Sequence, residues 1–184
     1  MPVLLQETVQ YLNLKPEAIY VDGTTGSGGH SLEILSHLPE NSRLICLDRD
    51  PDAIRLSLER LGSDPRVHFT QANFSDLAGV MRDLTIEKID GILLDLGMSS
   101  YQIEQSGRGF SFIREEPLDM RMNPSHKPTG EHLINTLSAR SLQTLLWEYG
   151  EERRAKTLAR AVVKAREREP IKTARSEERR VGKE

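Results

Sequence analysis

Residues 18–38 read AIYVDGTTGSGGHSLEILSHL, and this stretch decides the fold class. A short apolar run ends at Asp22, four glycines follow within the next seven residues, and a segment with helical periodicity begins after them. A strand, a tight turn and a helix in this order form the first half of a βαβ unit. Glycine at a turn indicates that something comes close to the backbone there.

The same alternation of apolar runs and helical patterns continues to residue 96. It predicts strands at 18–22, 43–48, 66–71 and 89–96, and helices at 29–38, 50–61 and 75–84. This order favours an α/β fold, a doubly wound parallel sheet of the Rossmann-like kind. Right-handed crossovers place the carboxyl ends of all strands at one edge, where such folds bind ligands. The glycine turn, Asp48, Phe74 and Asp95 all fall at that edge.

Details of the predicted helices and of the last strand follow from the same patterns. In the first helix we expect Leu32, Leu35 and Leu38 to face inward. In the second helix we expect Asp50 to be the N-terminal cap and Pro51 to be the first helical residue. In the third helix we expect Ser75 or Asp76 to be the N-terminal cap. The strand at 89–96 is apolar enough to be central, yet no later segment reads as another strand. We therefore expect an unpaired edge at this strand and a tendency to self-associate.

After residue 96 the pattern changes. Residues 97–130 are too long for an ordinary connection and rich in Phe, Met, Ile and Leu, which is typical of an ordered loop at a functional site. Two helices are predicted next, at 131–150 and 151–170, separated by Gly150. The second helix is amphipathic, with a basic stripe of Arg153, Lys156, Arg160 and Lys164 opposite Ala155, Leu158, Ala159 and Val162.

Charge and composition narrow the class of protein. Residues 1–150 carry 13 Lys and Arg against 21 Asp and Glu, whereas residues 151–184 carry 12 against 7. The basic end is either a solvated helix face or a contact for a polyanion. One cysteine, no signal peptide, no run long enough to span a membrane and no metal-ligand cluster favour a cytoplasmic protein without a metal centre.

The glycine turn admits three ligands. A nucleoside triphosphate requires a Lys followed by Ser or Thr after the last glycine of a P-loop, and Gly29 and His30 stand there instead. A dinucleotide requires a third glycine where this chain has Ser31, although Asp48 is placed to hold a ribose. S-adenosylmethionine needs the same acidic residue and close approach to the backbone, but no pyrophosphate cradle. A turn without a ligand is the fourth possibility.

Six motifs occur in a distinctive order: DGTTGSGGHS (22–31), LDRDP (47–51), DGILLDLGMSS (90–100), RGFSF (108–112), PLDMRM (117–122) and YGEER (149–153). From about residue 2 to residue 172 the chain resembles the MraW family of ribosomal RNA small-subunit methyltransferases. That resemblance implies a class I methyltransferase that uses S-adenosylmethionine to methylate the N4 amine of a cytosine in small-subunit (16S) ribosomal RNA.

The resemblance also assigns residues to the cofactor. Gly28, Gly29 and His30 would line its methionine end, Asp48 would hold the ribose hydroxyls, Phe74 would lie beside the adenine, and Asp95 and Gln102 would complete the pocket. Many amino-methyltransferases place Pro-Pro-aromatic after an acidic or amide residue at the end of the fourth strand, where this chain has DLGMSS. The catalytic group is therefore open, with Asp95, Ser99 and Ser100 as candidates.

Contacts to RNA are expected from two surfaces. Arg108, Phe110 and Phe112 would meet a displaced nucleotide, unless the phenylalanines pack under the loop. The basic stripe of Arg153, Lys156, Arg160 and Lys164 would follow phosphates.

We expect three segments: an S-adenosylmethionine-binding half at 1–100, a site loop and the start of a helical insertion at 101–172, and a non-native or disordered tail at 173–184 of a truncated chain. Two alternative functions stay open, an NAD-linked oxidoreductase and a non-catalytic fragment that binds RNA or ribosomes.

Overall fold

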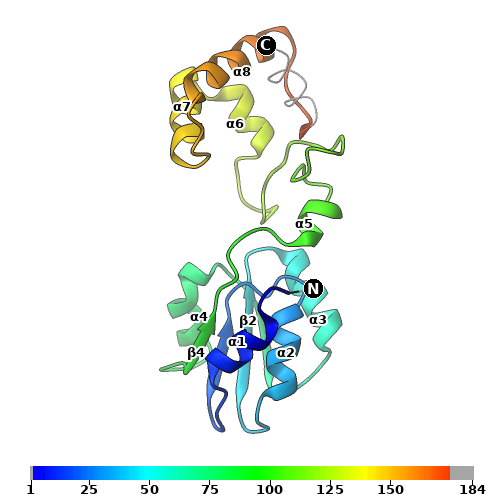
Figure 1. The fold of residues 1–184 in the computed structure, drawn as a ribbon, viewed down its shortest axis with the longest axis vertical. Helices are drawn as coiled ribbons and strands as arrows, with labels where there is room; N and C mark the ends of the chain where they lie inside the picture. Colours follow the sequence, from blue (N-terminus) through cyan, green and yellow to red (C-terminus); the bar gives the residue numbers. More distant parts are fainter. Residues whose placement is uncertain (1, 175–184) are drawn as a thin grey trace. The chain divides into compact units, whose positions relative to one another are not determined.

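A computed structural model describes residues 2–174, and the chain divides into two compact units, Met1–Ser99 and Ser100–Glu184. Figure 1 shows the elements of the first unit from α1, in blue, to β4, in green. Its strands are β1 (Ile19–Asp22), β2 (Arg43–Asp48), β3 (Val67–Gln71) and β4 (Gly91–Leu93). Its helices are α1 (Leu5–Leu12), α2 (Gly29–His37), α3 (Pro51–Leu61), the short 3₁₀ helix η1 (Phe74–Asp76) and α4 (Leu77–Asp83).

The strands form one parallel sheet in the order β3-β2-β1-β4, with Val21 paired to Ile45 on one side and to Ile92 on the other. The order reverses at β1, because β2 and β3 lie on one side of it and β4 on the other. This arrangement confirms the predicted doubly wound α/β fold and places the turn after β1 at the switch point, where such sheets bind ligands.

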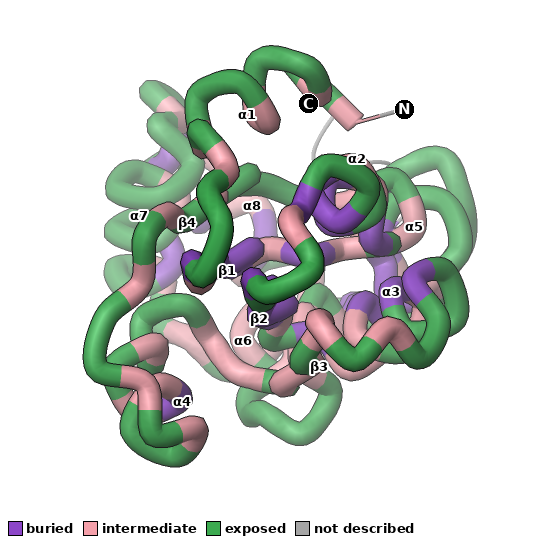
Figure 2. The backbone as a smooth tube through the Cα atoms, turned by 90° about the horizontal axis from the view of Figure 1, so that it is seen from below, coloured by how far each residue is buried: buried purple, intermediate pink, exposed green. Residues whose placement is uncertain are grey.

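Helices cover the two faces of the sheet because neighbouring strand residues point to opposite sides. On one face Tyr20, Leu44 and Cys46 pack with Ile34 and Leu35 of α2. On the other face the first two strands contribute Val21, Ile45 and Leu47, which pack with Val80 of α4. Figure 2 shows β1 and β2 as largely buried segments among the helices of this unit. The carboxyl ends of these strands are thereby held on a rigid support.

The fourth strand is an edge, as predicted: within the described residues β4 pairs only with β1. It is shorter than the predicted 89–96 and is not covered like a central strand. Alternate apolar residues on and after it are exposed, namely Ile92, Leu94, Leu96 and Met98. The face that β4 shares with Val21 and Ile45 therefore lies largely open beyond α4.

Helix starts and faces are partly as predicted. Asp50 caps α3, since its Oδ1 accepts a hydrogen bond from the amide of Asp52, and Pro51 is the first helical residue. Asp76 precedes α4 without a side-chain cap bond, and Asn73 caps η1 instead. The inward position predicted for Leu32 is wrong. Leu32 is 39% exposed because the buried stripe of α2 runs through Ser31, Ile34 and Leu35, about 100° away.

The second unit has the helices α5 (Ser100–Glu104), α6 (Gly130–Thr136), α7 (Ala139–Glu148) and α8 (Ala155–Arg168). The prediction of one helix over 131–150 is wrong: α6 stops before Leu137, and Ser138 starts α7 by accepting a hydrogen bond from the amide of Ser141. Leu142 of α7 and Ala159 and Val162 of α8 form the core of this unit. A long loop, residues 105–129, joins α5 to α6.

At its end the described chain returns to the loop. Thr173 forms an isolated bridge with Pro117, and the amide of Ala174 donates to the carbonyl of Glu116 across 3.1 Å. Of the tail predicted at 173–184, residues 175–184 lie outside the described residues. No helix within residues 2–174 is both long enough and apolar enough to span a bilayer.

Candidate active site

The glycine turn after β1 is shaped first by packing. A Cβ atom built on Gly28 would lie 2.6 Å from Cδ1 of Leu61, and one built on Gly23 would lie 2.6 Å from Cδ2 of Leu94. A Cβ on Gly29 would collide with Pro2. Gly26 differs, because the nearest atom to its Cβ would be 3.9 Å away. Three of the glycines thus leave room for neighbouring side chains of the protein itself, whereas the turn has space for a ligand at Gly26.

Asp22 ties the turn to the end of β1, and the sequence analysis did not single it out. Its Oδ2 accepts a 2.6 Å hydrogen bond from the hydroxyl of Ser31, and its Oδ1 accepts the amide of Thr24 at 3.2 Å. Burial raises the pKa of Asp22, and the bonds from Ser31 and Thr24 oppose that rise. The available signal was its position, since Asp22 closes the first strand as Asp48 closes the second.

Asp48 joins the turn to the end of β2. Its Oδ2 accepts the amide of Gly26 at 3.0 Å, and its Oδ1 accepts the amide of Asp50 at 2.9 Å. Burial raises the pKa of this carboxyl, and hydrogen bonds from the backbone of Asp50, Gly26 and Arg49 oppose that rise. A carboxylate offers about four lone-pair sites, so three amides leave acceptor capacity for a further donor. A hydroxyl, as on a ribose, matches that capacity.

His30 near the start of α2 faces Asp95, which follows β4. The Nε2 atom of His30 is 2.8 Å from the carbonyl oxygen of Val3, and its Nδ1 is 3.8 Å from Oδ2 of Asp95. The amide of Asp95 donates to Oγ1 of Thr24 at 2.7 Å, which fixes the end of β4 against the turn. The imidazole is buried, whereas the Asp95 side chain is 57% exposed.

Phe74 and Ser99 complete the surroundings within the first unit. Phe74 begins η1 just after β3, is 40% exposed, and has its Cβ 3.3 Å from where a Cβ of Gly23 would stand. The Cβ of Ser99 lies 4.0 Å from the corresponding point on Gly26. The structure thus gathers most of the predicted cofactor residues around one turn: Gly28, Gly29, His30, Asp48, Phe74 and Asp95. The other predicted residues, Ser100 and the buried Gln102, belong to α5 of the second unit.

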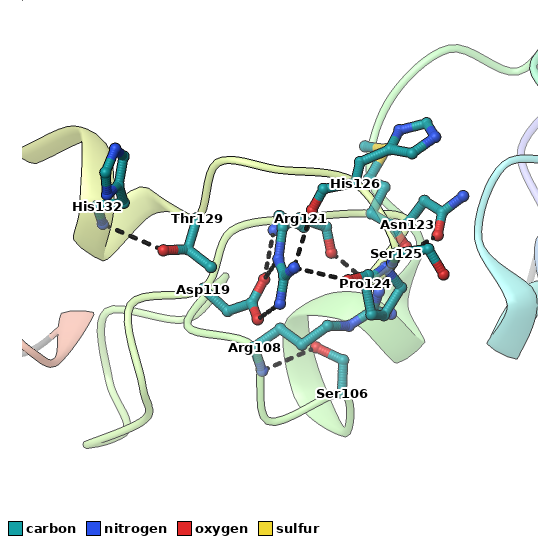
Figure 3. A network of polar contacts seen from close by, with 11 residues as sticks. Ser106, Arg108, Asp119, Arg121, Asn123, Pro124, Ser125, His126, Thr129 and His132 are labelled. Atoms are coloured by element: carbon teal, nitrogen blue, oxygen red, sulfur yellow. Dashed lines mark hydrogen bonds and ion pairs between the residues drawn. The ribbon is translucent and has the colours of Figure 1, made fainter.

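The long loop of the second unit is organised by two arginines (Figure 3). Arg121 forms a two-pronged ion pair with Asp119, with Nε 2.7 Å from Oδ1 and Nη2 2.6 Å from Oδ2, and this lowers the pKa of Asp119. Its Nη1 donates to the carbonyls of Pro124 and His126. The Nη1 of Arg108 donates to the carbonyls of Arg121 and Met122. The loop between α5 and α6 is therefore cross-linked through its own backbone.

The predicted RNA residues differ in exposure. Arg108 is 7% exposed and holds the loop together, with its guanidinium carbon 5.8 Å from the ring centre of the half-buried Phe110. Phe112 is 67% exposed. Lys156, Arg160 and Lys164 are exposed on α8 opposite its buried face, as expected, but Arg153 precedes the helix. The contacts of all these residues with RNA stay predictions. No cluster of three or more potential metal ligands occurs among the residues that the structure describes.

Comparisons with known proteins agree with these features. A profile of the MraW methylase family matches residues 1–180. The protein called ribosomal RNA small subunit methyltransferase H from Coxiella burnetii is 46% identical over 171 residues, which cover 92% of this chain and 56% of that relative. The protein of the same name from Nitrosospira multiformis is 50% identical over 171 residues, covering 93% and 54%. The chain thus spans about half the length of these curated relatives, and it belongs to the MraW methylase family.

Proposed function

We propose that this chain is the S-adenosylmethionine-binding part of a cytoplasmic enzyme that methylates the exocyclic N4 amine of a cytosine in small-subunit ribosomal RNA. Residues 1–100 form its cofactor-binding half, and residues 101–172 form its site loop and the start of a helical insertion. Family membership and the names of the relatives support methylation of ribosomal RNA. The observation that carries the proposal is the carboxylate of Asp48 bound to the open glycine of the turn, Gly26.

The residues at the turn fit S-adenosylmethionine. Asp48 retains acceptor capacity for a ribose hydroxyl beside the amides that it already accepts. Phe74 offers a partly exposed ring beside Gly23 for the adenine. Gly28, Gly29 and His30 would line the methionine end, with Asp95 beside them in the first unit, and Gln102 on α5 of the second unit is a further candidate for the cofactor. When bound, the cofactor supplies a methyl group on a positively charged sulfur, which is a good leaving group.

The protein's part in the reaction is alignment and charge stabilisation. Holding two reactants in line can remove roughly 7–11 kcal/mol of the barrier. The lone pair of the cytosine amine is delocalised into the ring, so acceptors on its N–H groups would localise the pair and take up developing positive charge. Asp95 is the favoured acceptor because it is half-exposed and fixed by Thr24. Ser99 and Ser100 are the further candidates.

The RNA must present an unstacked base to such a site. Phe112 is exposed and available for stacking, and Phe110 beside Arg108 is the second aromatic candidate. The buried Arg108 would act by ordering the loop. The exposed Lys156, Arg160 and Lys164, with Arg153 before them, would contact phosphates. Each phosphate contact that a Lys→Gln or Arg→Gln change removes should lower the slope of log K against log salt by about 0.7–0.9. Lys88→Gln, an exposed change in the first unit, should leave the slope unchanged.

An NAD-linked oxidoreductase is the alternative that shares the fold. It is disfavoured because the third glycine of its fingerprint is replaced by Ser31, which is fully buried and bonded to Asp22. A non-catalytic RNA-binding fragment is the second alternative.

Two measurements test the proposal. Calorimetric titration should give heat with S-adenosylmethionine and none with NAD; the reverse would establish the oxidoreductase. Labelled methyl should pass from S-adenosylmethionine to small ribosomal subunits that lack the modification and not to large subunits, with the label released as N4-methylcytosine on digestion. Cofactor and RNA binding without label transfer by the full-length protein would establish the non-catalytic alternative.

A further inference from the structure

His30 is held in a way that determines which of its ring nitrogens carries hydrogen. Its Nε2 lies 2.8 Å from the carbonyl oxygen of Val3. A carbonyl oxygen only accepts hydrogen bonds, so Nε2 must be the donor. In the neutral imidazole, Nδ1 then carries a lone pair, and that lone pair faces Oδ2 of Asp95 at 3.8 Å. A lone pair opposite a carboxylate is repulsive, whereas one added proton turns the contact into an attraction.

The two partners differ in their access to solvent. The His30 ring is buried beneath the N-terminal segment, and the Asp95 carboxylate is more than half exposed at the end of β4. A donor arriving from outside therefore meets Asp95 first, with His30 behind it. The backbone of Asp95 is held at Thr24, so the carboxylate is presented from a fixed point.

The other charged groups around His30 are engaged elsewhere. Asp22, at the end of β1, faces His30 closely enough to be influenced by its charge, but both of its oxygens accept hydrogen bonds from Ser31 and Thr24. Glu33, one turn further along α2, lies 3.7 Å from Nδ1 of His37. The N-terminal segment contributes the neutral carbonyl of Val3.

We propose that His30 and Asp95 act as a pair that takes up the proton released from the substrate amine. Asp95 is the proton acceptor, and His30 is the residue that positions its carboxylate. This rests on the proposed function. The methyl carbon bonds to the amine lone pair as its bond to sulfur breaks, and the sulfur keeps the bonding electrons. The cationic amine nitrogen then loses one N–H proton to the carboxylate of Asp95, whose Oδ2 faces the Nδ1 lone pair of His30 at 3.8 Å. The sulfur, initially positive, ends neutral, and the pair ends one proton richer.

The equilibrium part of the proposal is testable on this chain without any ligand. Nitrogen NMR of the histidine rings should find His30 as the Nε2–H tautomer at high pH. Asp95→Asn should shift the Nδ1 resonance of His30, because the carboxylate facing that lone pair is replaced by an amide that can donate to it. His37, exposed on the same helix, serves as the internal control, and its resonances should not move. An Nδ1–H tautomer, or a His30 Nδ1 resonance indifferent to Asp95→Asn, would overturn the pair.

The kinetic part uses two variants of the full-length protein at saturating cofactor and RNA. In His30→Gln the side-chain amide can still donate to Val3, but no ring nitrogen faces Asp95; His30→Asn is the second variant, in case the first does not fold. The kcat of the variants should fall by up to about 100-fold, the low end for a positioned proton acceptor, while the KM for RNA stays unchanged. An unchanged kcat in the variants would refute the pair, whereas no methyl transfer by the unaltered protein would instead refute the proposed function.

Discussion

The amide of Gly26 donates a 3.0 Å hydrogen bond to Oδ2 of Asp48, so the turn after the first strand and the carboxylate at the end of the second strand form one structural unit. Asp48→Asn should weaken S-adenosylmethionine binding, because the amide group would set a donor against the N–H of Gly26 or Asp50 and would lose the charge that attracts a ribose hydroxyl. Hydrogen bonds to charged groups contribute about 1.5–3 kcal/mol, which is roughly a 10- to 150-fold loss in affinity by calorimetry. Asp83→Asn, an exposed change on α4, should bind like the unaltered chain.

The turn itself can be tested by adding a single methyl group. Gly28→Ala places a Cβ against Leu61 and Ser57 in a left-handed conformation, φ +76°. We expect a loss of about 2–4 kcal/mol in the free energy of unfolding by urea denaturation, from left-handed strain and overpacking together. Gly26→Ala has a comparable φ of +53° but open space, and should cost only about 1–2 kcal/mol. Equal losses in the two variants would contradict the packing role of Gly28.

The buried carboxyl of Asp22 predicts a stability that falls with rising pH. Burial raises its pKa above the ordinary 3.8, so the folded chain binds this proton more tightly than the unfolded chain does. Between the ordinary and the raised pKa, the unfolded chain therefore holds fewer protons, and the free energy of unfolding declines as pH increases. Asp22→Asn should remove this decline in urea titrations made at a series of pH values. Asp64, whose pKa is lowered by Arg66, has the opposite sign, and Asp64→Asn should remove stability that is lost on acidification.

Cys46 should be inert in the folded chain. It is fully buried in β2, and burial raises the pKa of its thiol to about 12. Because the thiolate is the reactive form, alkylation at pH 8 should be slow and limited by unfolding, and complete in denaturant. Rapid reaction of the native chain with a thiol reagent would mean that β2 is accessible.

The open edge of the sheet should favour association between chains. Ile92 on β4 is 41% exposed and lies next to backbone groups that no other strand of residues 2–174 pairs. A lysine on an edge strand discourages strand pairing, so Ile92→Lys should lower the average mass found by sedimentation equilibrium at high concentration. Leu58→Lys removes an exposed apolar residue from α3 and should leave the mass unchanged.

The sequence was sufficient for the parallel sheet because β1, β2 and β3 each end in a polar residue at the ligand edge, and Asp95 follows β4 by two residues. Asp48 and Asp95 could be placed at that edge from this pattern alone. Leu32 could not be placed correctly, because the glycine turn sets the rotation at which α2 meets the sheet, and that rotation turns Ser31 and Ile34 inward. The periodicity of apolar residues indicates that a helix has a buried face, but it does not determine which residue lies at the middle of that face.

Two other features depended on long-range contacts. The break between α6 and α7 needs Ser138 as a cap, but a serine inside a periodic segment is also common in an uninterrupted helix. From the sequence alone, Arg108 is expected to be an exposed cation next to aromatic residues. Its guanidinium is buried because the carbonyls of Arg121 and Met122, thirteen and fourteen residues later, accept its hydrogen bonds. No local pattern encodes such a partner.

The contact of Pro2 with Gly29 and of Val3 with His30 affects how the protein should be produced. A purification tag fused at the N-terminus would begin next to the residues that hold the imidazole, and a scar left after cleavage would remain there. Handles for immobilisation, labelling or crystallisation are better placed away from this end, for example at the exposed Glu87 and Lys88 before β4.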